Sequence, residues 1–211
     1  ITKADLVVSG ITASNRVYDT TVTAVLGGTA AVSPLSNDVV SVGGTAAGVF
    51  ADKNVGNGKA ITITGVTISG TDADNYNLVQ QTGLTANVTA KSITITGTTA
   101  SNKVYDADVA ATLVTTSSAI TNGATSSSDN KYYTADTVSL VKTGAAATFA
   151  NKNVADGKAV TVTGFSLSGA DADNYALVQP TGLTANITKA DLVVSGITAS
   201  NRVYDTTVTA V

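Results

Sequence analysis

The sequence predicts an all-β protein built from tandem repeats, because it carries an internal repeat and a period-two alternation of apolar residues. Residues 1–25 are identical to residues 187–211, a shift of 186 residues (187 minus 1). A diverged copy of the same opening, KSITITGTTASNKVYDADVAATL, starts at Lys91. We therefore divide the chain into a first β repeat, a second β repeat and the start of a third, truncated repeat: residues 1–90, 91–188 and 189–211.

The strands are predicted by short segments in which β-branched apolar residues alternate with Thr or Ser, the pattern of half-buried strands. Glycines interrupt these segments at matched places in both repeats. After Gly65 the apolar positions change parity, from Ile63 to Val66, so we expect a β-bulge or bend that keeps the apolar side inward. The predicted strands include residues 6–12, 61–70, 93–99 and 160–169.

Two dipeptides at equivalent places, Asn57-Gly58 and Asp156-Gly157, are typical of tight hairpins, because both central residues of such turns need a positive φ. Helix is disfavoured, since the chain has no Glu and no long 3.6-residue period. The expected hairpins run from Phe50 to about Ile63 and from Phe149 to about Val162.

Two small folds suit a repeat of about 90 residues with these turns: an Ig-like β-sandwich and a β-grasp-like sheet. The joins between repeats, residues 85–97 and 184–196, contain no Pro, no Ser/Gly-rich spacer and no block of charge. A flexible linker has a different composition. We therefore predict that nearly continuous strands join the repeats end to end in an elongated rod.

The composition indicates how the core is built and which classes of binding partner are disfavoured. Hydrophobic residues make up 43% of the chain and aromatic residues 5%, so we expect two ordinary cores built mainly from Val, Ile, Leu and Ala. The net charge of −3 and the lack of a basic patch disfavour nucleic acid. No apolar run approaches the roughly 20 residues of a membrane span.

Most of the residue types that catalysis needs are missing, because the chain has no Cys and no His, and all 15 acidic residues are Asp. A hydrolase with paired carboxylates remains as an option. The Asp residues, however, lie in turns that both repeats share. We therefore expect no enzyme activity, no catalytic residue, no cofactor and no metal ligand.

Three motifs occur in both repeats, and together they resemble the YDG-domain repeats of filamentous-haemagglutinin-like bacterial surface adhesins. The resemblance implies long arrays on secreted or surface-anchored proteins, and it supplies no catalytic residue. The chain departs from the family at the glycine of the name, where Thr20 and Ala107 stand, so another residue must make that turn. The motifs are the Tyr-Asp motif (Asn15 to Asp19, Asn102 to Asp106), the Lys-Asn-Val motif (Lys53 to Lys59, Lys152 to Lys158) and the Asp-Asn-Tyr motif (Asp74 to Val79, Asp173 to Val178).

Acidic pairs beside the Asp-Asn-Tyr motifs allow two interpretations. Asp72 with Asp74, and Asp171 with Asp173, place oxygen ligands at alternate positions, as a Ca²⁺ site would. The same residues also favour a turn in which Asp and Asn side chains cap the backbone. The turn is the preferred interpretation, since Ca²⁺ needs six or more ligands and no third carboxylate accompanies the segment.

The Tyr-Asp motifs could form a recognition surface. The preferred hypothesis is structural: Tyr18 and Tyr105 pack on the core edge and bond the backbone through their hydroxyls, while Asp19 and Asp106 close turns.

Three weaker candidates complete the set. Asn87 and Asn186 stand in N-x-T glycosylation patterns, and Lys91 near Asn87 is a formal candidate for an isopeptide bond. The Ser/Thr-rich insertion at residues 115–130 is expected to be an exposed loop or hairpin tip. With the Tyr132–Tyr133 pair that follows, it is the place where a binding function would most readily lie.

These observations predict a structural stalk of a large secreted or cell-surface bacterial adhesin, whose repeats contact their neighbours and project a distal region for attachment or biofilm formation. A carbohydrate- or protein-binding module within the adhesin is the alternative, with polysaccharide or a host or bacterial surface as partner. The last 25 residues, 187–211, are expected either to be poorly supported or to pair with another chain.

Overall fold

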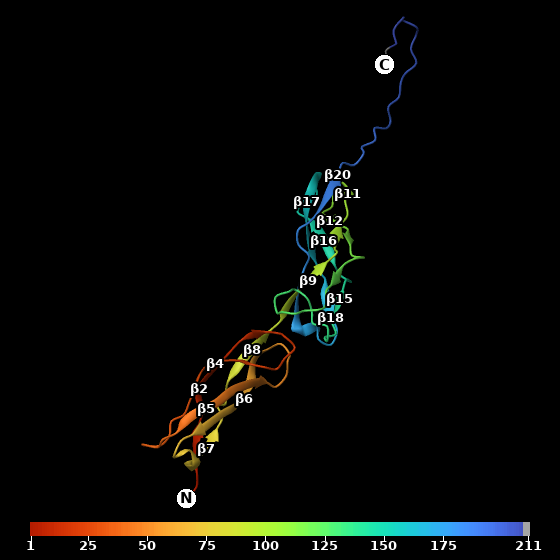
Figure 1. Ribbon diagram of the computed structural model, residues 1–211. Helices are drawn as coiled ribbons and strands as arrows, with labels where there is room; N and C mark the ends of the chain where they lie inside the picture. Colours follow the sequence, from red (N-terminus) through yellow and green to blue (C-terminus); the bar gives the residue numbers. More distant parts are fainter. Residues whose placement is uncertain (209–211) are drawn as a thin grey trace.

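The computed structural model describes residues 1–208, and within them the protein is all-β, as predicted. Helix in this part of the chain is limited to two 3-10 turns, η1 (Ala73–Asn75) and η2 (Ala172–Asn174). No helix among these residues is both long enough and apolar enough to cross a membrane. The strands fall into two groups, β1–β8 and β9–β20, which we call the first unit and the second unit (Figure 1).

The first unit has a four-stranded sheet in the order β3-β8-β6-β5 and two strand pairs, β1-β7 and β2-β4. Its opening and closing segments run parallel: β1 pairs with β7 and β3 pairs with β8. The other pairings are antiparallel. The strands are β1 (Ala4–Val7), β2 (Ser9–Ser14), β3 (Arg16–Val17), β4 (Val25–Ala31), β5 (Ser41–Phe50), β6 (Gly56–Ser69), β7 (Tyr76–Val79) and β8 (Thr85–Thr89).

The second unit repeats this plan with shorter strands, in the sheets β11-β20-β17-β16-β12 and β14-β9-β19 and the pairs β15-β18 and β10-β13. Its parallel pairs, β9 with β19 and β11 with β20, match those of the first unit. The strands are β9 (Lys91–Thr96), β10 (Thr99–Ala100), β11 (Lys103–Val104), β12 (Ala110–Ala111), β13 (Leu113–Val114), β14 (Ala119–Ile120), β15 (Ser139–Val141), β16 (Ala146–Phe149), β17 (Ala155–Thr163), β18 (Ser166–Ser168), β19 (Tyr175–Val178) and β20 (Leu183–Thr188).

The bulge predicted at Gly65 is present. Gly65 has φ of +85°, and the register of β5 against β6 shifts between Gly44 and Ala47, opposite this residue. Ile63 and Val66 are both buried, so the bulge changes the parity and keeps both side chains inside. A Cβ on Gly65 would lie 2.3 Å from the carbonyl oxygen of Thr45, which explains why only glycine fits.

The two hairpins form, but the Asn-Gly and Asp-Gly pairs do not make their tips. Phe50 pairs with Ile61, as expected for the first hairpin. Asn57-Gly58 instead lies within β6, at a bulge opposite β8. Gly58 has φ of +58° and donates its N–H to Oδ1 of Asn87 at 2.7 Å. Gly157 and Asn186 repeat this contact in the second unit. The place of the glycine in the fold therefore depends on a third strand, which the local sequence does not indicate.

The apolar core differs from the two separate cores that composition suggests. One buried cluster starts in the first unit, around Tyr18 and Phe50, and continues into the second unit through Ile93, Val138 and Tyr175. A second cluster, which includes Phe149 and Phe165, lies wholly within the second unit. The boundary between the units is therefore packed like an interior.

The first join is almost continuous, as predicted: Ala90 alone separates β8 from β9. The second join differs, because β20 ends at Thr188 and residues 189–208 contain no strand and run away from the second unit, exposed (Figure 1). The predicted third repeat, 189–211, includes residues 209–211, which lie outside the described residues.

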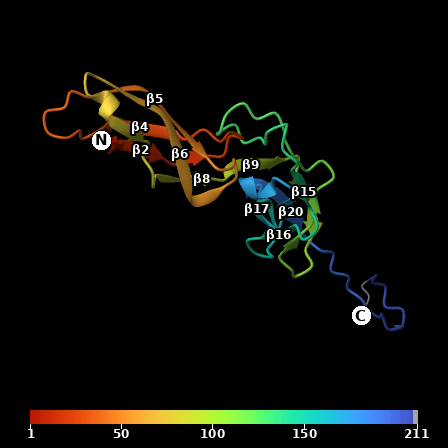
Figure 2. The same ribbon diagram turned by 90° about the horizontal axis from the view of Figure 1, so that it is seen from below.

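The insertion at residues 115–130 is only partly the exposed loop that the sequence predicts. Its strand β14 pairs with β9, and Ser118 is buried. The rest of the loop lies beside the junction of the units (Figure 2), where Asp129 forms an ion pair with Lys91, Oδ1 to Nζ 2.7 Å. The insertion therefore contacts the join between the two units, a contact that the composition of the join did not indicate.

Candidate functional site: the joint between the two units

Each Tyr-Asp motif is a short strand followed by a turn. In the first unit, Asn15 Oδ1 accepts the N–H of Asn87 at 2.7 Å and ties the motif to β8. Asp19 accepts the N–H of Thr21 at 2.9 Å and forms an ion pair with Arg16, Nη1 to Oδ1 2.5 Å. Asp19 therefore closes the turn as predicted, and the turn fixes the position of Tyr18, which precedes it.

The residue in the glycine position adopts the glycine conformation. Thr20 has φ of +70°, and Ala107 has φ of +67° at the equivalent place. L-residues reach this region at a cost of roughly 1–2 kcal/mol, and a β-branched residue such as threonine is a clear outlier there.

We expect Thr20→Gly to raise the free energy of unfolding by about 1 kcal/mol, the relief of strain less the extra chain entropy of glycine. Thr12→Gly, in the extended strand β2, is the matched control and should lower it by about 0.5–1 kcal/mol. Urea unfolding checks both variants, and a loss of stability in Thr20→Gly would contradict the strain argument.

Each Lys-Asn-Val motif is a loop held by its second lysine. Lys59 Nζ donates to the backbone carbonyls of Asp52 and Asn54, at 3.1 and 2.6 Å, and also pairs with the Asp52 side chain. This leaves the first lysine, Lys53, free to point out of the unit. Together with Tyr18 at the same end, the loop forms a surface that we call the tail of the first unit: Tyr18, Lys53, Asn54 and Val55.

The facing surface belongs to the start of the second unit. Tyr175 donates its hydroxyl proton to Oδ2 of Asp136 at 2.6 Å and accepts the N–H of Tyr133 at 2.9 Å. Asp171, which precedes η2, accepts the N–H of Thr137 at 2.9 Å and so ties this turn to the segment before β15. We call this surface the head of the second unit: Tyr133, Asp136, Asp171, Asn174 and Tyr175.

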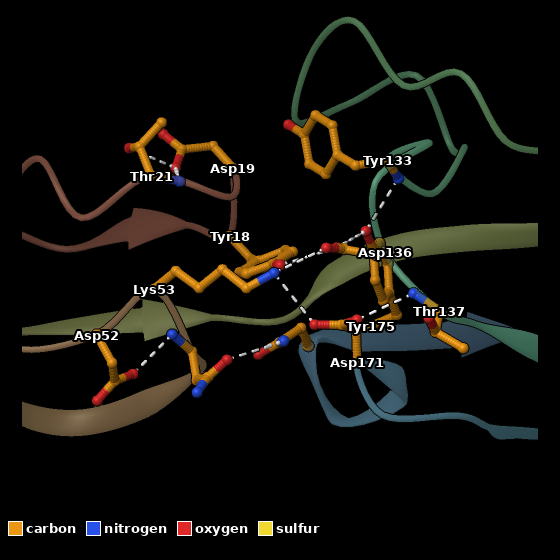
Figure 3. A network of polar contacts seen from close by, with 12 residues as sticks. Tyr18, Asp19, Thr21, Asp52, Lys53, Tyr133, Asp136, Thr137, Asp171 and Tyr175 are labelled. Atoms are coloured by element: carbon orange, nitrogen blue, oxygen red, sulfur yellow. Dashed lines mark hydrogen bonds and ion pairs between the residues drawn. The ribbon is translucent and has the colours of Figure 1, made fainter.

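Head and tail meet around the Asp136 carboxylate (Figure 3). Tyr18, which is 0% exposed, donates its hydroxyl proton to Oδ2 of Asp136 at 2.8 Å. Lys53 Nζ lies 2.8 Å from Oδ1 of Asp136 and 3.1 Å from Oδ1 of Asp171. The Tyr18 hydroxyl was expected to bond local backbone; it bonds a side chain 118 residues away instead.

Polar and aromatic contacts extend this joint on both sides. Asn174 accepts the N–H of Val55 at 2.9 Å through Oδ1, and its amide donates to Oδ1 of Asn54 at 3.2 Å. The ring of Tyr18 packs edge-on against Tyr133 and Tyr175, with centroids 6.1 and 5.6 Å apart. Such pairs contribute about 0.5–1.5 kcal/mol each beyond the area they bury.

The Tyr132–Tyr133 pair is therefore not free to act as the exposed binding surface that the sequence suggests. Tyr133 lies against Tyr18, and Tyr132 lies edge-on to Tyr175 with centroids 6.4 Å apart. Both rings are half-buried in the joint. The insertion that precedes them stabilises the joint, because Lys91, its side chain 0% exposed, pairs with Asp129 and lies over the Tyr133 ring.

The joint shifts the pKa values of several of its titratable groups. Burial raises the pKa of Tyr18 to about 12, and burial likewise raises the pKa of Tyr175 above its usual range. Hydrogen bonding to the Asp136 carboxylate raises the pKa of Lys53. The Thr137 N–H, with Lys53 as the second cause, lowers the pKa of Asp171.

These directions predict loss of stability in alkali. Because the pKa of Tyr18 is raised, its contribution is complete below its unfolded pKa, near 10, and is lost as pH rises toward about 12. We expect the free energy of unfolding to fall by roughly 2 kcal/mol over that interval, with Lys53 adding to the fall. Urea unfolding at successive pH values measures this slope. Tyr18→Phe should reduce the slope, and an unchanged slope would contradict the assignment.

The acidic pairs lie at the two 3-10 turns, but Asp72 and Asp171 make no side-chain hydrogen bond that caps these turns, so the expected capping role is wrong. Their side chains bind backbone and side-chain groups of distant segments instead. Asp72 accepts the N–H of Val39 at 2.8 Å, and Asp171 is engaged by Thr137 and Lys53. Among residues 1–208, no group of three or more potential ligand side chains is arranged to hold a metal ion. Asp136 and Asp171 both pair with Lys53, and both oxygens of Asp136 are already bonded.

The modification candidates have other partners. Oδ1 of Asn87 and of Asn186 each accepts a glycine N–H across the β6–β8 or β17–β20 pair, so both side chains serve their sheets. Lys91 pairs with Asp129 rather than with Asn87. Glycosylation at the two asparagines remains a prediction.

A comparison with known protein families finds one whose model matches the parts of the chain that contain these motifs. The YDG domain family model matches residues 2–83 and again residues 89–182, which together cover most of the chain. The chain belongs to the YDG domain family. No curated protein and no solved structure matches it.

All three repeated motifs of the YDG units supply the joint, with Tyr18, Lys53 and Asn174 from one motif each. Asp136 was missed, because it lies outside the motifs in the part of the repeat that diverges. A weak signal was present: Asp-x-Val-Ser occurs at residues 38–41 and again at residues 136–139. Tyr105, the second predicted tyrosine, lies at the other end of its YDG unit and is half-buried.

Proposed function

We propose that this chain is a length of stalk in a large secreted or cell-surface bacterial adhesin, in which YDG units follow one another end to end in a stiff rod. The joint carries the proposal. A protein whose units acted separately would gain nothing from burying Tyr18 completely and surrounding Asp136 with partners from both units.

The contacts of the joint suit a load-bearing role. The Asp136 side chain is 0% exposed, so its ion pair with Lys53 is screened less than a surface pair would be. The apolar cluster that continues from Tyr18 into Ile93 adds packing that resists bending between units. One residue between β8 and β9 leaves little slack in the connection.

Backbone ¹⁵N relaxation of the full chain tests the stiffness on which the proposal rests. We expect both YDG units to report one anisotropic tumbling time. A variant with a ten-residue Gly-Ser insertion after Ala90, combined with Tyr18→Ala, is the control and should give two shorter times. Independent tumbling of the units in the unaltered chain would refute the stalk.

Location requires a separate measurement. Antibodies raised against the chain should label intact source bacteria, and brief protease treatment of whole cells should remove the label. Labelling that appears only after the cells are lysed would contradict a place on the cell surface.

A further inference from the structure

The outer ends of the two units carry residues equivalent to those of the two surfaces that meet in the joint. At the start of the first unit, Tyr76 donates its hydroxyl proton to Oδ2 of Asp38 at 2.6 Å and accepts the N–H of Leu35 at 2.8 Å. Tyr175, Asp136 and Tyr133 make the same contacts in the head of the second unit. We call this surface the head of the first unit: Leu35, Asp38, Asp72, Asn75 and Tyr76.

The far end of the second unit matches the tail of the first in the same way. Lys158 Nζ holds the loop by donating to Oδ1 of Asn151 at 2.6 Å and to the carbonyl of Asn153 at 2.8 Å, as Lys59 does in the first unit. Lys152 is left pointing outward, as Lys53 is. We call this surface the tail of the second unit: Tyr105, Lys152, Asn153 and Val154.

Exposure shows that these two surfaces have no partner in the described chain. Asn174 is 4% exposed in the joint, whereas Asn75 at the equivalent place is exposed. Leu35, in the position of Tyr133, is 63% exposed, whereas Tyr133 is half-buried in the joint. Among residues 1–208, Lys152 has no ion-pair partner.

The two surfaces are complementary in charge, and each borders a cleft. The head of the first unit is a cleft lined by Leu35, Asp38, Asn75 and Tyr76, with Lys3 also on its rim. The tail of the second unit borders a cleft that has Tyr105, Asn153 and Val154 on one side and residues 189–192 on the other, so a docking partner must displace that exposed segment. Lys152 is the counterpart of Lys53, which pairs with Asp136 and Asp171 in the observed joint, and Asp38 and Asp72 are the counterparts of those two carboxylates.

The sequence itself orders the units this way. Residues 187–211 repeat residues 1–25 without a change, so the tail of the second unit leads directly into the opening of a first-type unit. The matching surfaces therefore belong to the successive units of one array.

We propose that the head of the first unit binds the tail of a second-type YDG unit, supplied for the isolated chain by a second copy, and that copies thereby join head to tail in an open line. The inference rests on the proposed function in taking the observed joint as the repeating contact of a stalk. The contact is heterologous, because the head and the tail are different surfaces, so each added copy leaves a head free at one end of the line and a tail free at the other.

Disulfide trapping in the full chain tests the contact, because the protein has no cysteine of its own. The variant Asn75→Cys with Asn153→Cys places one thiol on the head and one on the tail. On oxidation we expect a ladder of covalent oligomers, at least tenfold stronger than from Asn75→Cys paired with Thr181→Cys, an exposed residue outside the tail. Each single variant can give dimers at most.

Exchanging the charges of the two surfaces distinguishes specific docking from crosslinking by random collision. Adding Asp38→Lys to the trapping variant should weaken the ladder at least fivefold, and adding Lys152→Asp as well should restore it. A ladder no stronger than the Thr181 control, or one indifferent to these charges, overturns the proposal.

The internal joint supplies the reference. Asn54→Cys with Asn174→Cys should close a disulfide within one chain, since the two amides are in contact at 3.2 Å. If this disulfide forms and the ladder does not, the contact between copies is refuted and the stalk proposal stands. If neither forms, both fail.

Discussion

Replacing Asp136 with alanine is expected to lower the free energy of unfolding by about 3–4 kcal/mol and to uncouple the two YDG units. The side chain is 0% exposed and accepts two tyrosine hydroxyls and the Lys53 ammonium. Removing one partner of a buried pair costs roughly 3–5 kcal/mol, because the remaining groups stay desolvated and unpaired. The lower part of that range applies, since the Lys53 side chain is 35% exposed and can regain water.

Asp38→Ala is the matched control. Asp38 accepts the Tyr76 hydroxyl as Asp136 accepts Tyr175, but no second unit covers it in the described chain. We expect a loss of about 1 kcal/mol, the value of one hydrogen bond. Urea unfolding gives the stabilities, and ¹⁵N relaxation shows whether the units still tumble together. Equal losses in the two variants would mean that the joint adds nothing.

Gly65→Ala is expected to lower the free energy of unfolding of the first unit by about 3 kcal/mol or more. The positive φ of +85° alone costs an alanine roughly 1–2 kcal/mol. In addition, the new Cβ would lie 2.3 Å from the Thr45 carbonyl oxygen, so β5 must move away from β6. That movement disturbs the sheet from which the Lys53 loop extends.

Gly58→Ala isolates the steric part of this loss. Gly58 also has a positive φ, of +58°, yet nothing lies within 4 Å of the site of its Cβ. We expect a loss of only about 1 kcal/mol, the conformational cost by itself. Thermal or urea unfolding of the two variants measures the difference. The close contact at Gly65 has no consequence if the two losses agree within error.

Local pattern predicted strands correctly at several places within the two units. Alternating β-branched residues predicted them, and the parity change at Gly65 predicted a bulge that is present. Local pattern was insufficient for Asn57-Gly58, which has the preference of a hairpin tip but lies in a bulge held by Asn87 on another strand. A turn dipeptide specifies a backbone conformation, whereas its place in the fold depends on which strand comes alongside.

The candidate site was likewise predicted from the sequence only in part. The repeated motifs marked Tyr18 and Lys53 as special, but nothing near them in the sequence named Asp136, 118 residues beyond Tyr18. The insertion was also predicted only in part: Ser/Thr-rich composition predicted exposure, while pairing of β14 with β9 and the Lys91–Asp129 ion pair tie it to the joint.

The two identical segments at the ends of the chain separate the contributions most clearly. Both segments have the residue pattern of β-strands, with the same alternation and the same turn residues. In the first segment Leu6, Ile11 and Tyr18 are 3%, 4% and 0% exposed, whereas their counterparts Leu192, Ile197 and Tyr204 are 82–93% exposed. Burial was decided by tertiary structure alone, because strands need partners for their backbone groups and apolar faces, and only the first segment has β7, β8 and a facing head beside it.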